Sequence, residues 1–232
     1  MTPTEIIVAL DLETLSAEDE LLSRLHGTIR HYKIGLRMFT AFGRRAVELV
    51  HKHGGDVFLD LKLHDIPQTV AHAVQEAHKL GVFSVSLHTS GGADMLRAAH
   101  ELPSRPKLWG VTVLTSLCDA DVKAIHPRAS VRTLASRLAV HAQPYVDGII
   151  CSGKEVPSLR EELGENTCFI TPGIRRSGGA AHDQKRMITP AEAARLDIRY
   201  IVVGRPITQA QDPLKAADDI LAEIRNAGPV RQ

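Results

Sequence analysis

Short apolar runs alternate with longer amphipathic segments along the whole chain. Eight of these runs have the length and composition of buried strands, and they cover residues 6–10, 32–34, 57–61, 84–87, 108–113, 148–151, 168–171 and 200–203. Strands that alternate with helices are typical of βαβ units, in which the strands lie parallel in one sheet. The pattern therefore predicts an α/β protein.

The segments between the strands carry helical signals. Apolar residues recur at helical spacing over residues 39–53, 67–80, 131–143, 154–163 and 214–227. Glycine follows several of these segments and Pro144 follows the third, as expected at helix ends. A further helix is predicted to begin near Ser16, because Asp19 follows it at the spacing of a capping box.

The number of β/α repeats limits the possible architectures. Eight repeats without a linker rich in proline, glycine or serine predict a single closed (β/α)8 TIM barrel over residues 1–232. An open doubly wound sheet is the alternative, but that fold usually has fewer strands in a chain of this length. No Gly-x-Gly-x-x-Gly follows the first run, which weakens the case for a dinucleotide site.

Composition narrows the class of protein. The hydrophobic fraction of 44% and the charged fraction of 24% are ordinary for a soluble globular protein. The net charge is +1, and the basic residues are spread along the chain, which does not suggest a patch for nucleic acid or membrane. The chain begins without a signal-like segment, and no apolar run approaches the roughly 18 residues that span a bilayer. Cys118, Cys151 and Cys168 lack Cys-x-x-Cys spacing, so we expect reduced thiols in the cytoplasm.

A group of charges stands at the end of the third run, within Asp60-Leu61-Lys62-Leu63-His64-Asp65-Ile66-Pro67. Because side chains alternate across a strand, Asp60 and Lys62 should project to one face, with Leu61 and Leu63 on the other. Asp65 then lies just past the strand. Buried charges cost free energy unless they are paired, so a structural ion pair and a catalytic site are both open interpretations.

Other polar residues follow the remaining runs. In a barrel the catalytic face lies at the carboxyl ends of the strands, where this sequence places Asp11, Lys33, Thr115, Ser116, Arg175, Gly204 and Arg205. Loops after the seventh and eighth strands of such barrels often bind phosphate, which suits Gly204 and Arg205. Residues 175–181 are cationic and long enough to close over a ligand, with a solvated loop as the alternative.

The lysines near these carboxylates point to acid chemistry. Lys33 and Lys62, placed between Asp60 and Asp65, would form an array of alternating charge. An ammonium beside a carboxylate is favoured in its charged form, and a protonated lysine is a poor imine-forming nucleophile but a capable proton donor. Two carboxylates could instead hold Mg²⁺, although the interposed lysines already neutralise them.

Taken together, these motifs make the chain similar to the orotidine 5′-phosphate decarboxylase family, which completes de novo UMP synthesis. The resemblance covers nearly the whole length. It rests on Ala9-Leu10-Asp11, Lys33-Ile34-Gly35, the segment from Phe58 to Pro67, Leu114-Thr115-Ser116, Thr171-Pro172-Gly173-Ile174-Arg175, Asp183-Gln184 and Val202-Val203-Gly204-Arg205-Pro206-Ile207-Thr208. It implies a decarboxylase that uses neither a metal nor a cofactor.

The resemblance also implies a role for each site residue. Lys62 resembles the donor that protonates C6 of the pyrimidine, Asp60 the carboxylate beside the substrate carboxylate, and Lys33 and Asp65 the rest of the charged array. The implied substrate contacts are Asp11 and Lys33 with the ribose, Thr115 and Ser116 with the ribose–pyrimidine region, and Arg175, Gln184, Gly204 and Arg205 with the phosphate. A homodimer is also implied, with Asp65, Ile66 and Thr69 entering the neighbouring subunit's site.

Two other functions compete with this one. The first is a Mg²⁺-dependent sugar-phosphate decarboxylase or synthase on the same barrel, and the second is a catalytically silent phosphosugar-binding module. The Pro-Gly-Ile-Arg and Gly-Arg-Pro-Ile-Thr segments favour the nucleotide substrate over the first. The complete charged array argues against the second, because binding alone does not require it.

Overall fold

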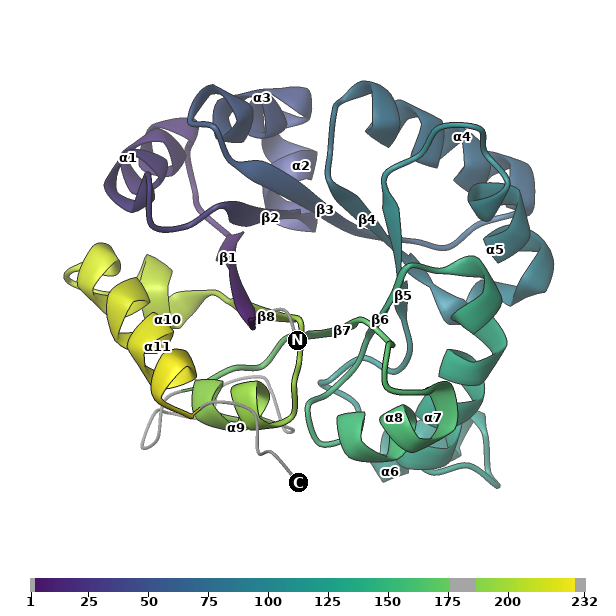
Figure 1. The fold of residues 1–232 in the computed structure, drawn as a ribbon. Coiled ribbons are helices and arrows are strands. Elements are labelled where there is room, and N and C mark those ends of the chain that lie inside the picture. The colour runs from purple at the N-terminus through teal and green to yellow at the C-terminus, as the bar shows by residue number, and fades with distance from the viewer. Residues whose placement is uncertain (1–2, 176–186, 228–232) are drawn as a thin grey trace.

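A computed structural model of the chain describes residues 3–175 and 187–227. Its eight parallel strands close into a barrel in the order β1 to β8, with β1 paired to β8 (Figure 1). The strands are β1 (Glu5–Leu10), β2 (His31–Gly35), β3 (Asp56–Leu63), β4 (Ser84–His88), β5 (Lys107–Val111), β6 (Gly148–Ile150), β7 (Phe169–Thr171) and β8 (Tyr200–Val203). The predicted barrel is confirmed, and each strand lies within two residues of its predicted bounds.

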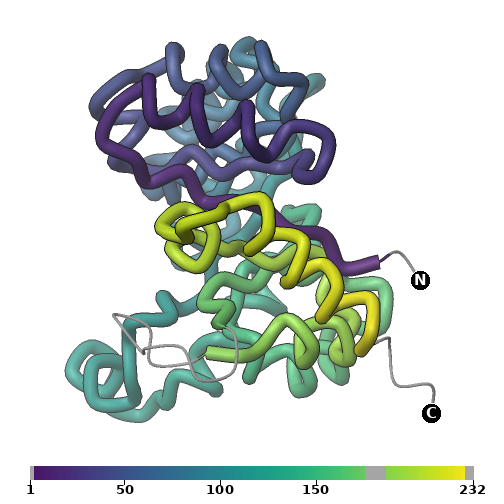
Figure 2. Tube along the Cα trace, turned by 90° about the vertical axis from the view of Figure 1, so that its left-hand side faces the viewer, coloured from purple at the N-terminus to yellow at the C-terminus, as the bar shows by residue number. Residues whose placement is uncertain are grey.

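Helices surround the barrel (Figure 1). They are α1 (Leu15–Leu25), α2 (Leu36–Phe42), α3 (Arg44–Lys52), α4 (Pro67–Lys79), α5 (Gly92–His100), α6 (Asp119–Ile125), α7 (Val131–Ala142), α8 (Val156–Leu163), α9 (Pro190–Arg195), α10 (Arg205–Thr208) and α11 (Pro213–Ala227). Figure 2 shows the last helix beside the first elements of the chain, where α11 packs against α1 and β8 pairs with β1. The barrel is therefore closed by the two ends of the sequence.

Two helix predictions were wrong, and both errors concern helix ends. The helix predicted over 39–53 is two helices, α2 and α3, because Gly43 between them has a φ of +56°, which interrupts the helix and favours glycine. Helix α1 begins at Leu15, since the Thr14 hydroxyl accepts a hydrogen bond from the Ala17 amide at 3.1 Å. Ser16 therefore lies inside the helix. Helices α5, α6, α9 and α10 have no counterpart among the predicted helices.

Apolar side chains form two layers on either side of the strands. The layer inside the barrel comprises Ile7, Ala9, Phe58, Trp109, Val111, Ile150, Ile170, Tyr200 and Val202. A larger cluster fills the space between the strands and the helices, and Leu61 and Leu63 pack against it, as predicted from the alternation in β3. Because the barrel interior is filled, ligands reach the strands only at their ends.

Candidate active site

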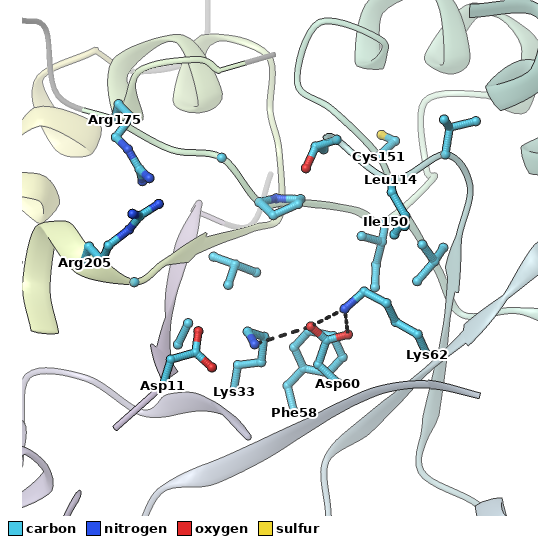
Figure 3. Close-up of a pocket in the computed structure, with 18 residues that line it drawn as sticks. Asp11, Lys33, Phe58, Asp60, Lys62, Leu114, Ile150, Cys151, Arg175 and Arg205 are labelled. Carbon is cyan, nitrogen blue, oxygen red and sulfur yellow. Dashed lines mark hydrogen bonds and ion pairs between the residues drawn. The ribbon is translucent and has the colours of Figure 1, made fainter. Parts of the chain in front are cut away.

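A cavity of about 300 Å³ opens at the carboxyl ends of the strands. Figure 3 shows its charged side chains, which come from the ends of β1, β2, β3, β7 and β8. Eight of the predicted site residues line the cavity: Asp11, Lys33, Asp60, Lys62, Thr115, Arg175, Gly204 and Arg205. The other lining residues are mainly apolar: Ala9, Phe58, Val111, Val113, Leu114, Ile150, Cys151, Pro172, Gly173 and Val202.

Asp60 lies between two lysines on one side of this cavity (Figure 3). The Lys62 Nζ is 2.9 Å from each of its carboxylate oxygens, and the Lys33 Nζ is 3.4 Å from Oδ2. The Asp60 residue is only 8% exposed, so water screens these charges weakly. The three groups form a compact array in which one carboxylate holds two ammonium groups.

The array sets the protonation state of Asp60. Burial alone would raise the pKa of this carboxyl group, because the charged form is poorly solvated. The ammonium groups of Lys33 and Lys62 act in the opposite direction, together with hydrogen bonds from Lys62 and Ser86. The balance holds the pKa of Asp60 below its usual value. Asp60 is therefore an anion at neutral pH and acts as a hydrogen-bond acceptor.

The contact between Asp60 and Lys62 was predicted from regular strand alternation, but the backbone reaches it differently. Lys62 has a φ of +51°, and the pairing of β3 with β4 shifts register between Leu59 and Leu63. A left-handed conformation at a residue with a side chain costs roughly 1 to 2 kcal/mol, and such strain is often found at functional sites. The irregular backbone is therefore that of Lys62 itself, whose ammonium group contacts Asp60.

Ser86, on β4, is a buried residue that the sequence analysis missed. Its Oγ accepts a hydrogen bond from the Lys62 amide at 2.9 Å and donates one to Asp60 Oδ1 at 2.8 Å. Val85 and Leu87 pack in the cluster between strands and helices, so the alternation along β4 places Ser84 and Ser86 on the face toward the barrel interior. Nothing in the sequence revealed the bulge in β3 that brings Ser86 into contact with the array.

Gly35 leaves room for Lys33 to bend toward Asp60. A Cβ atom at this position would lie 2.8 Å from the Lys33 Nζ, closer than real Cβ contacts allow. The neighbouring loop is held by Arg37, whose guanidinium donates to the Asp11 carbonyl oxygen at 3.2 Å. The close approach of the ammonium group to the backbone therefore favours a glycine at the last position of β2.

Two guanidinium groups lie across the cavity from the array. Arg175 follows β7 and Arg205 is the first residue of α10, and Figure 3 shows both side chains extending into the same region. Arg175 is anchored by its backbone amide, which donates to the Ile188 carbonyl at 3.1 Å, and by its side chain, which donates to the Ile174 carbonyl at 2.8 Å. Two cations at this position are suited to bind a phosphate group.

Several predicted residues lie outside this cavity. Ser116 is exposed and is not part of its wall. Asp65, Ile66 and Thr69 are exposed around the start of α4, and the Asp65 carboxylate accepts the Ile66 amide at 2.6 Å without an ion pair to any described residue. Gln184 lies outside the residues that the structure describes.

The sequence of the chain is similar to a known protein family and to named relatives over almost its whole length. The family model described as the orotidine 5′-phosphate decarboxylase / HUMPS family matches residues 4–220. A relative from Saccharophagus degradans, named orotidine 5′-phosphate decarboxylase, is 45% identical and the match covers 96% of each chain. A relative of the same name from Hahella chejuensis is 43% identical, with 95% of this chain and 97% of the relative covered.

A solved structure gives the same result. The crystal structure of orotidine 5′-phosphate decarboxylase from Lactobacillus acidophilus is similar, with a TM-score of 0.82 and 34% sequence identity. The similarity covers 95% of this chain and 98% of that one. The chain therefore resembles these proteins in both sequence and fold over almost its entire length.

Proposed function

The chain belongs to the orotidine 5′-phosphate decarboxylase / HUMPS family, and we propose that it converts orotidine 5′-phosphate to UMP and CO2 in pyrimidine biosynthesis. One observation carries the proposal: Asp60 is held between Lys33 and Lys62 on one side of a cavity that has two guanidinium groups on the other. The substrate has a carboxylate on its pyrimidine and a phosphate at the far end of its ribose. Its two anionic ends match the two cationic regions.

The lysine array supplies the acid for this reaction. The bond between C6 and the carboxyl carbon breaks, CO2 leaves, and the electron pair stays on C6. The Lys62 ammonium then donates a proton to C6, and its neutral amine takes a proton from water. An ammonium already oriented by Asp60 at 2.9 Å stabilises the developing negative charge without further reorganisation.

The remaining residues bind and orient the nucleotide in our proposal. Asp60 lies beside the substrate carboxylate, and Asp11 and Lys33 contact the ribose hydroxyls. The other proposed contacts are Thr115 and Ser116 with the ribose–pyrimidine region, and Arg175, Gln184, Gly204 and Arg205 with the phosphate. Phosphate binding far from C6 can contribute to the chemical step when its binding energy favours the reactive arrangement.

The proposed reaction needs no metal, unlike the Mg²⁺-dependent sugar-phosphate alternative. Both oxygens of Asp60 already accept hydrogen bonds from Lys62, and Oδ1 also accepts one from Ser86. A divalent cation would have to displace these donors to reach the carboxylate. Within residues 3–175 and 187–227, no three histidine, cysteine or acidic side chains are placed together as metal ligands.

One assay separates the three candidate functions. Purified protein is incubated with orotidine 5′-phosphate, with and without excess chelator, and UMP formation is followed. We expect the same turnover in both samples. Turnover that chelator abolishes would overturn the metal-free reaction, and UMP binding without any turnover would support the silent binding module.

We also propose a homodimer in which each protomer contributes to its neighbour's site. Ile66 is a large apolar side chain that is 67% exposed, and burial in an interface would remove it from water. Asp65 and Thr69 are exposed beside it, outside the cavity of their own chain. Their position just after Lys62 supports a role across a twofold interface, where Asp65 would complete the array.

Complementation between two inactive variants tests this proposal. In a dimer of Lys62→Ala with Asp65→Ala, one site carries both defects and the other carries neither. Co-expressed variants should therefore recover about a quarter of wild-type activity, since half the dimers are mixed and half their sites are intact. If Asp65 served its own chain's site, mixing would restore nothing.

The proposal extends to the whole chain and its compartment. We propose that residues 1–232 form one barrel domain that works in the cytoplasm. Cys118, Cys151 and Cys168 form no disulfide, which supports a reducing environment. No helix among the described residues has the length and apolar character that a membrane crossing requires. Cell fractionation with an antibody to the protein would test the compartment.

A further inference from the structure

We propose that Ser86 is a positioning residue for the reaction, because one hydroxyl fixes both the Lys62 backbone and the Asp60 carboxylate. This inference rests on the proposed decarboxylase function and deepens it. The Ser86 residue is fully buried, and its Oγ lies 2.9 Å from the Lys62 amide nitrogen and 2.8 Å from Asp60 Oδ1. It contacts the array without lining the cavity.

The direction of each hydrogen bond follows from the chemistry of its partners. A backbone N–H can only donate, so Ser86 Oγ must accept from Lys62. The single hydroxyl proton is then donated to Asp60 Oδ1, and the ionised carboxylate accepts it more strongly than the neutral acid would. Ser86 therefore favours the ionised form of Asp60, in agreement with the lowered pKa of that group.

The bulge in β3 creates the need for this hydroxyl. Where the register of β3 against β4 shifts, the Lys62 amide donates a hydrogen bond to the side chain of the neighbouring strand, at Ser86 Oγ. A buried amide without an acceptor is strongly disfavoured. Ser86 therefore satisfies the amide in the left-handed conformation, and that conformation brings the Lys62 side chain back onto Asp60.

Ser84 provides an internal comparison. It lies two positions earlier on β4, faces the same barrel interior and is equally buried, but its hydroxyl has no hydrogen-bond partner in the described part of the chain. A serine in this part of the barrel therefore does not need its hydroxyl for packing. Ser86 differs from Ser84 in its two hydrogen bonds, and these bonds support a positioning role.

The first test compares Ser86→Ala with the matched control Ser84→Ala. In Ser86→Ala we expect kcat to fall by about ten- to a hundredfold, because two hydrogen bonds that orient a charged group are lost. The dissociation constant of UMP should change by less than about threefold, since the phosphate contacts are untouched. Ser84→Ala should keep the wild-type kcat.

The pH profile provides a measurement that a packing role would not change. Loss of the Ser86 hydrogen bond should raise the pKa of Asp60, so the acidic limb of the kcat/KM profile should move to higher pH by about one unit. An unshifted limb, or an equal loss of kcat in Ser84→Ala, would overturn the proposal. If Ser86→Ala does not fold, Ser86→Cys keeps a similar shape with a weak donor and should show the same shifts.

A second measurement needs no turnover and separates this inference from the proposed function. The Asp60 carboxyl group is titrated by ¹³C NMR in aspartate-labelled protein, with Asp60→Asn used for assignment. The midpoint should rise in Ser86→Ala and stay constant in Ser84→Ala. If the wild-type protein failed to decarboxylate orotidine 5′-phosphate, the function would be wrong, whereas this titration would still decide whether Ser86 controls Asp60.

Discussion

Charged side chains pair at both ends of the barrel, but the two groups of charges serve different purposes. At the amino end, His31 Nε2 lies 2.8 Å from Glu5, and Arg30 lies 2.7 Å from Asp56. Arg199 pairs with the same Glu5. Two arginines therefore offset two carboxylates. At the carboxyl end, Asp60 is shared between two lysines, and two arginines lie across the cavity.

The two groups differ in net charge and in the open space around the charged side chains. The described lining of the cavity has four cations and two carboxylates, which leaves a surplus of two positive charges. At the amino end, His31 is packed against Phe83 and Tyr200, and burial lowers the pKa of its imidazole despite nearby Glu5 and Asp56. The balanced group around His31, which is packed against aromatic rings, indicates a structural role, whereas the surplus positive charge around the cavity at the carboxyl end indicates a ligand site.

The largest expected effect is at the carboxyl end. Lys62→Ala should lower kcat/KM by about a thousandfold or more, because the proton donor and its charge are both lost. Lys107→Ala is the matched control, since this exposed lysine lies at the amino end with its Nζ 4.6 Å from the Phe83 ring. Steady-state kinetics and circular dichroism measure both variants. A Lys62→Ala enzyme within tenfold of wild type would break the comparison.

The next effect concerns the cationic side of the cavity. Arg205→Ala should lower kcat/KM by about a hundredfold and weaken UMP binding similarly, because a charged hydrogen bond to phosphate contributes about 1.5–3 kcal/mol. Uridine, which lacks the phosphate, should bind the variant and the wild type equally. Calorimetry with both ligands measures this. Equal losses for UMP and uridine would mean that Arg205 does not recognise the phosphate.

At the amino end the expected effect is on stability alone. His31→Ala should lower the free energy of unfolding by about 2 kcal/mol, because Glu5 loses a buried hydrogen-bond donor and a cavity forms. Urea denaturation measures the loss, and kcat/KM at a temperature where the variant is folded should remain at the wild-type value. Reduced turnover in a fully folded variant would show that the two ends are coupled.

The smallest expected effect concerns Glu18, a buried acid that lies outside both groups of charges and has no cation beside it in the described part of the chain. Glu18 is fully buried, neither of its carboxylate oxygens has a hydrogen-bond partner among the described residues, and burial, assisted by Asp19, raises its pKa to about 8. The folded state therefore holds this proton more tightly than the unfolded state, so stability is greatest below the unfolded pKa and falls as pH rises toward 8.

Glu18→Gln removes that titration. Its unfolding free energy should depend less on pH than that of the wild type, and above pH 8 it should exceed the wild-type value by about 1 kcal/mol or more. Urea denaturation at several pH values measures this. An unchanged pH dependence would mean that Glu18 stays ionised in the folded protein.

The sequence predicted the architecture well because buried parallel strands are continuous apolar runs, and eight such runs leave few arrangements. Barrel topology then placed Asp11, Lys33 and Arg205 at one end without further information. Local details were harder to predict. The break at Gly43 and the cap at Thr14 depend on backbone angles that the hydrophobic pattern does not encode.

The site was predictable where a side chain acts through its charge and position along a strand. Ser86 escaped because its role depends on a register shift in the neighbouring strand, which no local pattern in β4 reveals. The roles of Asp65, Ile66 and Thr69 remain predictions, since they require a second copy of the chain. The charged side chains at the ends of barrel strands are thus easier to predict than the backbone irregularities that orient them.

The left-handed backbone at Lys62 has a consequence for protein engineering. Glycine or asparagine would adopt its φ of +51° with less strain, so selection for thermal stability alone should enrich Lys62→Gly and Lys62→Asn. Selection for growth without added uracil should remove the same variants. Stability and activity therefore select in opposite directions at this position, and libraries screened only for heat resistance would drift toward well-folded, inactive barrels.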